Sequence, residues 1–129
     1  MSPKFKKIMI VDDNEFDSYI TARLIQNSNL ATEVIEFNSA KLALEFLVEN
    51  QNNTKILPDV ILLDIYMPLM DGFEFIEKFK GLSAEANSYC KICVVSTTVN
   101  DYYIHKAKID ENIKFTSKPI TTDFLNSLD

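Results

Sequence analysis

Three uninterrupted apolar runs, at residues 8–11, 60–63 and 92–95, stand out along the chain. A continuous apolar run, in place of alternating apolar and polar residues, is typical of a strand that is buried on both faces. Such strands belong to parallel sheets that helices cover on each side. Two weaker strands are predicted at 33–37 and 114–116.

Helical patterns separate the predicted strands, with apolar residues spaced three or four positions apart. The inward-facing stripes that this spacing predicts are Phe16, Ile20 and Leu24; Ala40, Ala43, Leu44 and Leu47, after the helix-capping Ser39; and Phe73, Ile76 and Phe79. Two further helices are predicted at 101–108 and 122–128. The chain therefore alternates strand and helix five times.

This alternation predicts an α/β fold, a doubly wound (βα)5 domain with a parallel five-stranded sheet. Right-handed crossovers leave few topologies open, and we expect the flavodoxin-like strand order 2-1-3-4-5. The polar tract 50–54 is too short for a linker and is interpreted as a loop. With 129 residues and no internal repeat, the whole chain 1–129 is expected to be a single domain.

The charge balance narrows the function classes. Thirteen Lys and Arg against nineteen Asp and Glu give a net charge of −6, which argues against binding to nucleic acid or to an anionic membrane. No apolar run approaches the length of about twenty residues that spans a bilayer. Asp12 also interrupts the apolar segment that a secretory signal would need. A cytoplasmic location is therefore expected.

The two cysteines, Cys90 and Cys93, have the Cys-x-x-Cys spacing of a redox or zinc site. There is no second pair to complete a zinc site, and residues three apart on a strand face opposite sides of a sheet. We interpret both cysteines as packing residues.

Polar residues follow the predicted strands at their carboxyl ends, where open parallel sheets bind ligands. They are Asp12 and Asp13 after the first strand, Asp64 after the third, Ser96 and Thr97 after the fourth, and Lys118 and Pro119 after the fifth. Because these strand ends line one crevice, the sequence predicts that three carboxylates, a hydroxyl and an ammonium group converge.

Three carboxylates at one place repel one another, so such a cluster takes up protons or binds a cation. An acidic site without His or thiolate suits Mg²⁺, which also binds phosphate oxygens. A carboxylate can act as a nucleophile towards phosphorus, with Mg²⁺ and a lysine neutralising the charge. Asp64, alone at the tip of the central strand, is best placed to attack.

Each feature also has an ordinary structural interpretation. Asp12 and Asp13 could cap the first helix, whose first turn carries Glu15 and Asp17 and so suits the helix dipole. A single lysine such as Lys118 is most often a solvated surface residue. Ser96 could simply end a strand, and Phe115 could be a core residue.

Taken together, these segments resemble the receiver domains of two-component response regulators. The matching segments are 8–14 with its acidic pair, 59–68 with Asp64, 70–73 with Gly72, Ser96 after its apolar run, and Lys118–Pro119. The resemblance covers essentially the whole chain.

The resemblance implies a role for each site residue. Asp64 would be the phosphoacceptor, and Mg²⁺ would be held by Asp13, Asp64 and the backbone carbonyl of Tyr66, with Asp12 as an outer-sphere partner. Lys118 would pair with a phosphoryl oxygen, aimed by a cis peptide bond before Pro119.

Three more positions match the family. Ser96 would donate its hydroxyl to the phosphate, and Phe115 would be the aromatic switch residue that turns inward after phosphorylation. Gly72 fits the tight turn after the acceptor loop, where a residue without a Cβ atom can take a positive φ.

The implied function is a single-domain response regulator without an output domain. A sensor histidine kinase or a histidine phosphotransfer protein would supply the phosphate, and the chain would assist its own phosphorylation and dephosphorylation without being an enzyme in the ordinary sense. A downstream protein would bind the surface formed by the helix at 101–108, the strand at 114–116 and the last helix. The chain would be a monomer or a weak homodimer.

Two alternatives remain open from the sequence. A Mg²⁺-dependent phosphohydrolase would also form an aspartyl phosphate, but it would need a second acid two residues after the nucleophile, where Tyr66 stands. A receiver-like docking module without phosphorylation is disfavoured because no charged residue of the site is missing.

Overall fold

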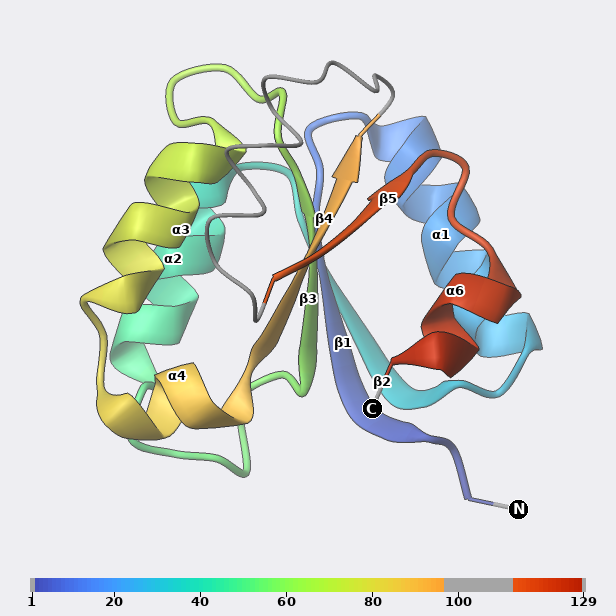
Figure 1. Ribbon diagram of the computed structural model, residues 1–129, viewed down its shortest axis with the longest axis horizontal. Helices are drawn as coiled ribbons and strands as arrows, with labels where there is room; N and C mark the ends of the chain where they lie inside the picture. The colour runs from blue at the N-terminus through green and yellow to red at the C-terminus, as the bar shows by residue number, and fades with distance from the viewer. Residues whose placement is uncertain (1, 97–112, 129) are drawn as a thin grey trace.

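The computed structural model describes residues 2–96 and 113–128, in which five parallel strands form one sheet between two layers of helices (Figure 1). The strands are β1 (Phe5–Val11), β2 (Ala31–Phe37), β3 (Val60–Asp64), β4 (Lys91–Ser96) and β5 (Lys114–Ser117). Their order in the sheet is β2-β1-β3-β4-β5, and every pair is parallel. The predicted fold class and strand order are confirmed.

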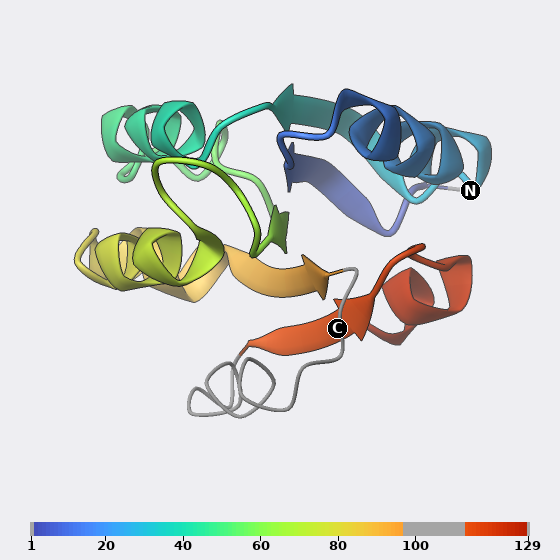
Figure 2. The ribbon, with the colours of Figure 1, turned by 90° about the horizontal axis from the view of Figure 1, so that it is seen from above.

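Helices cover both faces of the sheet. The described helices are α1 (Glu15–Asn27), α2 (Ala40–Glu49), α3 (Gly72–Lys80), α4 (Ala84–Tyr89) and α6 (Thr122–Ser127). Seen from above, α2, α3 and α4 lie on one side of the strands, and α1 and α6 lie on the other (Figure 2). The helix predicted at 101–108 lies outside the described residues.

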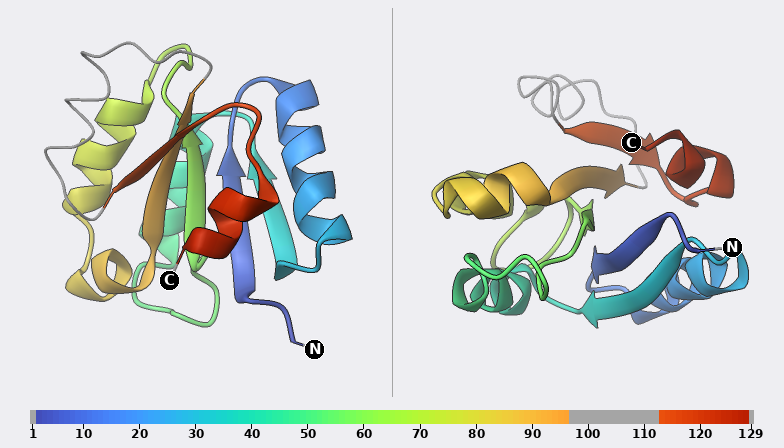
Figure 3. Two further views of the ribbon diagram at one scale, coloured as in Figure 1. Left: turned by 45° about the vertical axis from the view of Figure 1, so that its right-hand side comes forward. Right: turned by 90° about the horizontal axis from the view of Figure 1, so that it is seen from below.

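The continuous apolar runs are explained by two separate cores. Strand residues alternate between them, so that Met9 and Leu63 join the core under α2 and α3, whereas Ile8 and Leu62 join the core under α1 and α6. The same two layers are visible from below and after a 45° turn about the vertical axis (Figure 3). Every residue of β3 is buried, as expected for the central strand.

The two cysteines take part in this packing from opposite sides. Cys90 belongs to the core under α2 and α3, and Cys93 belongs to the core under α1 and α6. Both are free thiols, and burial raises the pKa of each to about 12. Such thiols are protonated and poorly reactive at neutral pH, so the interpretation as packing residues is confirmed.

The inward-facing stripe predicted for the first helix is wrong at two of its three residues. Phe16 is 70% exposed and Ile20 is 44% exposed, while the buried residues of α1 are Ser18, Ala22 and Ile25. The buried face combines the small Ser18 and Ala22 with the large Ile25, and the predicted Leu24 packs partly buried against the same core. The spacing of large apolar residues alone therefore does not identify this face.

The start of α1 is also different from the capping alternative. Asn14 is the N-cap, and its side chain accepts hydrogen bonds from the N–H groups of Phe16 and Asp17. The carboxylate of Asp12 instead accepts from the N–H of Asn14, at 2.9 Å. Asp12 and Asp13 therefore do not cap the helix, and the hydrogen bond to Asp12 stabilises the loop that leads into it.

The other predicted stripes agree with the structure. Ser39 caps α2, and the buried residues of that helix are Ala40, Ala43 and Leu47, with Leu44 partly buried. In α3, Ile76 and Phe79 are buried, Phe75 joins them, and Phe73 is partly buried. The six-residue α4 was not predicted, because Ala86 is its one buried residue and no stripe marks it.

Gly72 does not use the positive φ that a glycine can take, and the positive φ of this loop occurs at the exposed Leu69 (φ 70°). A Cβ atom at Gly72 would lie 2.8 Å from the Cα of Ile65 and 3.0 Å from the carbonyl oxygen of Asp64. The N–H of Gly72 donates to the carbonyl of Ile65 at 2.9 Å. The glycine is therefore required by a close backbone approach directly behind Asp64.

The substitution Gly72→Ala is expected to destabilise the fold by about 1–3 kcal/mol, because the added methyl group meets backbone atoms that cannot rotate away. Gly81→Ala is a matched control, since its nearest atom would be the Lys78 carbonyl oxygen at 3.4 Å. Urea unfolding of the two variants measures the difference. Equal midpoints for both variants would contradict the close-approach explanation.

Candidate functional site

The carboxyl ends of the strands meet at one edge of the sheet, at the top of Figure 1. Asp64 ends β3 and Ser96 ends β4, and Asp12 directly follows β1. All three are buried, whereas Asp13 is exposed. Polar residues are rarely buried without a partner or a function, so this edge is the first place to look for chemistry.

The three predicted acids do lie together. Carboxylate oxygens of Asp12, Asp13 and Asp64 all lie within 4.8 Å of one another. Two of these side chains are buried and one faces solvent, which leaves an open side to the cluster. An all-oxygen set of this kind fits a hard divalent cation such as Mg²⁺, with water completing its coordination.

Lys118 completes the predicted convergence. Its Nζ atom lies 2.7 Å from Oδ2 of Asp12 and 3.6 Å from Oδ2 of Asp64. A third carboxylate, that of Asp17 in α1, lies 2.9 Å from the same nitrogen. Asp17 was interpreted from the sequence only as a charge that suits the helix dipole. One sequence signal could have revealed the contact: α1 begins three residues after Asp12, so its first turn, which contains Asp17, lies close to the site.

Lys118 remains a cation in this environment. Burial by itself would lower the pKa of its ammonium group, but the hydrogen bonds to Asp12 and Asp17 and the nearby Asp64 raise it above its ordinary value. The site therefore holds a permanent positive charge beside the acids.

Asp64 has an unusual acidity. Burial, helped by the charge of Asp12, raises the pKa of its carboxyl group to about 6, although Lys118 and the N–H of Tyr66 act in the opposite direction. Perturbation of this size is typical of functional sites. At neutral pH the group is mostly ionised and able to act as a nucleophile.

Backbone groups hold the site residues in place. The N–H of Tyr66 donates to Oδ1 of Asp64 at 3.2 Å, and the Tyr66 side chain is 41% exposed beside it. On the other side, the N–H of Lys118 donates to the carbonyl of Ser96 at 2.8 Å, and the Lys118–Pro119 peptide bond is cis, as expected.

Phe115 lies on β5, opposite Val94 of β4 in the sheet register. Its side chain is partly buried and packs against the core under α2 and α3. This position is compatible with a core residue and with a switch residue, and its switching role stays a prediction.

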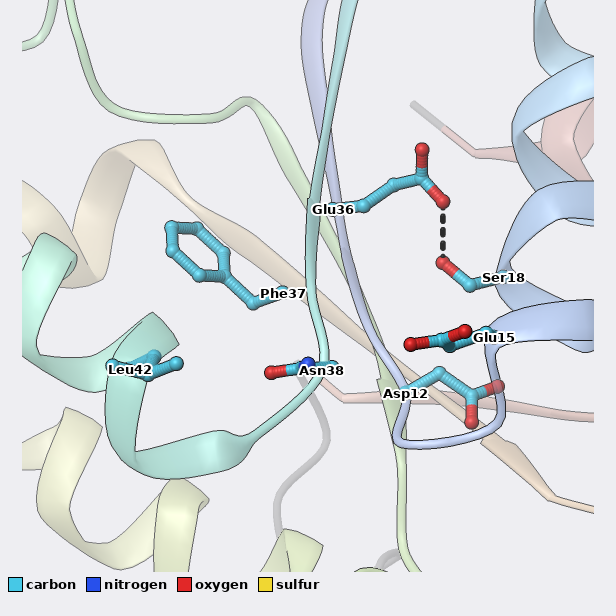
Figure 4. Close-up of a pocket in the computed structure, with 7 residues that line it drawn as sticks. All are labelled: Asp12, Glu15, Ser18, Glu36, Phe37, Asn38 and Leu42. Atoms are coloured by element: carbon cyan, nitrogen blue, oxygen red, sulfur yellow. Dashed lines mark hydrogen bonds between the residues drawn. The ribbon is translucent and has the colours of Figure 1, made fainter.

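A pocket of about 260 Å³ opens next to the acids, between the β1–α1 loop, the end of β2 and the start of α2 (Figure 4). Its lining includes the carboxylates of Asp12, Glu15 and Glu36. Glu36 accepts a hydrogen bond of 2.7 Å from the hydroxyl of the buried Ser18. This bond ties the first turns of α1 to β2 at the rim of the site.

The raised pKa of Asp64 has a consequence for stability in the absence of metal. Between about pH 4 and 6 the unfolded carboxyl releases its proton while the folded one keeps it, so the free energy of unfolding falls as pH rises through this window. Asp64→Asn removes this penalty. At pH 7.5 in EDTA we expect the variant to be about 1–3 kcal/mol more stable than wild type.

Urea unfolding at pH 4 and at pH 7.5 measures this effect. The stabilisation by Asp64→Asn is expected to be small at pH 4, where the wild-type carboxyl is protonated. A variant that is less stable than wild type at pH 7.5 would show that the buried carboxylate carries no such penalty.

Among the described residues, no helix has both the length and the apolar character needed to cross a membrane.

Relatives of known type share this sequence pattern. The chain is 34% identical over 79 residues to the two-component response regulator ORR1 of rice (Oryza sativa), an alignment that covers 60% of this chain and 34% of the rice protein. It is 23% identical over 118 residues to the probable methanogenesis regulatory protein FilR2 of Methanothrix harundinacea, covering 92% of this chain and 75% of that protein. The chain thus spans about a third of the length of the rice relative.

Solved structures share the fold. A response regulator receiver protein from Dyadobacter fermentans has a TM-score of 0.82 and 33% identity, with 93% of this chain and 91% of that chain covered. The receiver domain of the histidine kinase CKI1 from Arabidopsis thaliana, complexed with Mg²⁺ and BeF3⁻, has a TM-score of 0.73 and 23% identity, covering 94% and 85%. The family model of the response regulator receiver domain matches residues 8–128, and the chain belongs to this family.

Proposed function

We propose that this receiver domain is a Mg²⁺-dependent phosphoacceptor switch in which Asp64 receives the phosphoryl group. One observation carries the proposal: the buried Asp64 carboxylate lies beside the ammonium of Lys118 and within 4.8 Å of two further acids. A nucleophile, a fixed cation and a set of oxygen ligands are the parts that phosphoryl transfer to a carboxylate requires.

The acids are suited to hold the metal. Asp13 and Asp64 would ligate Mg²⁺ directly with the backbone carbonyl of Tyr66, and Asp12 would act through water. When bound, Mg²⁺ neutralises negative charge on the carboxylates and on the phosphoryl oxygens. The Arabidopsis receiver domain complexed with Mg²⁺ and BeF3⁻ has the same fold, which supports Mg²⁺ as the cation.

In the proposed reaction, a carboxylate oxygen of Asp64 attacks the phosphorus of a phosphohistidine on a sensor kinase or a phosphotransfer protein. The new O–P bond forms as the P–N bond breaks, and the imidazole leaves. Lys118 pairs with a phosphoryl oxygen, and the hydroxyl of Ser96 donates to another. Because Lys118 stays protonated, its charge is available throughout the transfer.

Phosphorylation would then change the surface around β5. Ser96 moves towards the new phosphoryl group, and Phe115 turns into the space that it leaves. Ser96, at the end of β4, pairs with Ser117 of β5, and Phe115 lies two residues before Ser117 on the same strand. The downstream protein would bind β5 and α6 together with residues 101–108, which lie outside the described residues.

Several finer expectations stay predictions. They are the stand-alone domain without an output domain, the cytoplasmic location, the monomeric or weakly dimeric state, and the part that the chain plays in its own phosphorylation and dephosphorylation. The phosphohydrolase alternative gains no support, because Tyr66 rather than an acid follows Asp64 at the second position.

The proposal is tested with radiolabelled acetyl phosphate and Mg²⁺. Wild type is expected to incorporate label that alkali releases, as an acyl phosphate does, and Asp64→Asn is expected to incorporate almost none. Asp123→Asn, which changes an exposed aspartate in the first turn of α6, serves as the matched control and is expected to label like wild type. Full labelling of Asp64→Asn would refute the assignment of the phosphoacceptor.

A further inference from the structure

The ion pair with Asp17 holds the ammonium group of Lys118, which the proposed function requires beside Asp64. An ammonium group has three N–H donors. Hydrogen bonds of 2.7 Å to Asp12 and 2.9 Å to Asp17 use two of them. The Asp64 carboxylate lies 3.6 Å from the same nitrogen, which is beyond hydrogen-bond distance. In this state Lys118 is directed towards Asp12 and Asp17 rather than towards the acceptor.

Asp17 cannot easily follow the lysine, because its backbone is fixed. Its N–H donates to the side chain of the N-cap residue Asn14 at 3.1 Å. The next residue, Ser18, is buried and donates to Glu36 of β2. A movement of the Lys118 ammonium towards a phosphoryl group on Asp64 therefore lengthens its bond to Asp17.

The two hydrogen-bonded partners of Lys118 differ in how easily they release it. The Asp12 side chain is 8% exposed, so without its cation it would be a buried, unpaired charge. The Asp17 side chain is 32% exposed, and with Lys118 and Pro119 it lines a pocket of about 250 Å³. Water can replace the lysine at Asp17, and the bond to Asp17 is therefore the one that breaks.

We propose that Asp17 is a positioning residue that holds Lys118 away from Asp64 and competes with the phosphoryl group for the position of the ammonium group. This inference rests on the proposed function of Asp64. A protein whose lysine must first be released binds a phosphoryl group more weakly than one whose lysine is free. Asp17 thus sets how readily this receiver domain is phosphorylated.

The test compares Asp17→Asn with Glu15→Gln. Both changes remove one negative charge from the first turn of α1, and Glu15 lies beside Asp12 in the lining of the acidic pocket (Figure 4). In the described part of the chain, the ion pairs of Lys118 are with Asp12, Asp17 and Asp64. Glu15→Gln therefore removes one negative charge but leaves the ion pair between Asp17 and Lys118 intact.

Beryllofluoride binding in saturating Mg²⁺, followed by NMR, is the main readout. Asp17→Asn is expected to bind beryllofluoride roughly three- to fivefold more tightly than Glu15→Gln, the size expected for loss of a partly exposed ion pair. Mg²⁺ alone provides a second readout. Both variants are expected to weaken its binding, because each removes a negative charge near the three acids, and saturating Mg²⁺ in the beryllofluoride titration compensates for this loss.

A third readout needs no phosphoryl analogue. Hydrogen exchange of the Lys118 ammonium, measured by NMR in the metal-free protein, is expected to be faster in Asp17→Asn than in Glu15→Gln. Equal beryllofluoride affinities for the two variants, or weaker binding by Asp17→Asn, would overturn the inference while wild-type binding upholds the proposed function. If neither wild type nor any variant binds beryllofluoride, the proposed function fails and the inference fails with it.

Discussion

The structure of this site depends on one ammonium group placed among carboxylates that would otherwise repel one another. Asp12 and Asp64 are buried, and their oxygens lie within 4.8 Å of each other and of Asp13. Without Lys118 these groups would take up protons or be forced apart. The parallel sheet makes the arrangement possible, because it delivers the ends of β1, β3 and β5 to the same edge from distant parts of the chain.

The single positive charge of Lys118 does not neutralise the three carboxylates, and this excess of negative charge favours the binding of a cation. The pKa of Asp64 stays raised to about 6 even with Lys118 beside it, so the metal-free site is electrostatically strained. Proteins commonly give up stability at functional sites in this way. In the proposed function, a divalent cation would relieve this strain, and a phosphoryl group would then add negative charge close to Lys118. Asp17, on the rim, adds a competitor for that lysine.

The features that were predictable from the sequence are the buried strands and the reactive side chains that directly follow them. Continuous apolar runs indicate burial on both faces, and the residue after each run must lie at the edge of the sheet, which placed Asp12 and Asp64 correctly. Failures occurred where small residues or backbone atoms decide the packing. The buried face of α1 includes the small Ser18 and Ala22, while the large Phe16 and Ile20 are exposed. Gly72 is explained by proximity to Ile65, which no local pattern reveals, and the Asp17 contact depends on how α1 sits against the β5–α6 loop.

The most direct measurement of the central claim is a crystal structure with Mn²⁺ and beryllofluoride, in which anomalous scattering locates the metal. The account predicts beryllium bonded to a carboxylate oxygen of Asp64, Mn²⁺ beside Asp13 and Asp64, and the Lys118 nitrogen within hydrogen-bond distance of a fluorine. Beryllium on another residue, or Mn²⁺ away from the three acids, would contradict it.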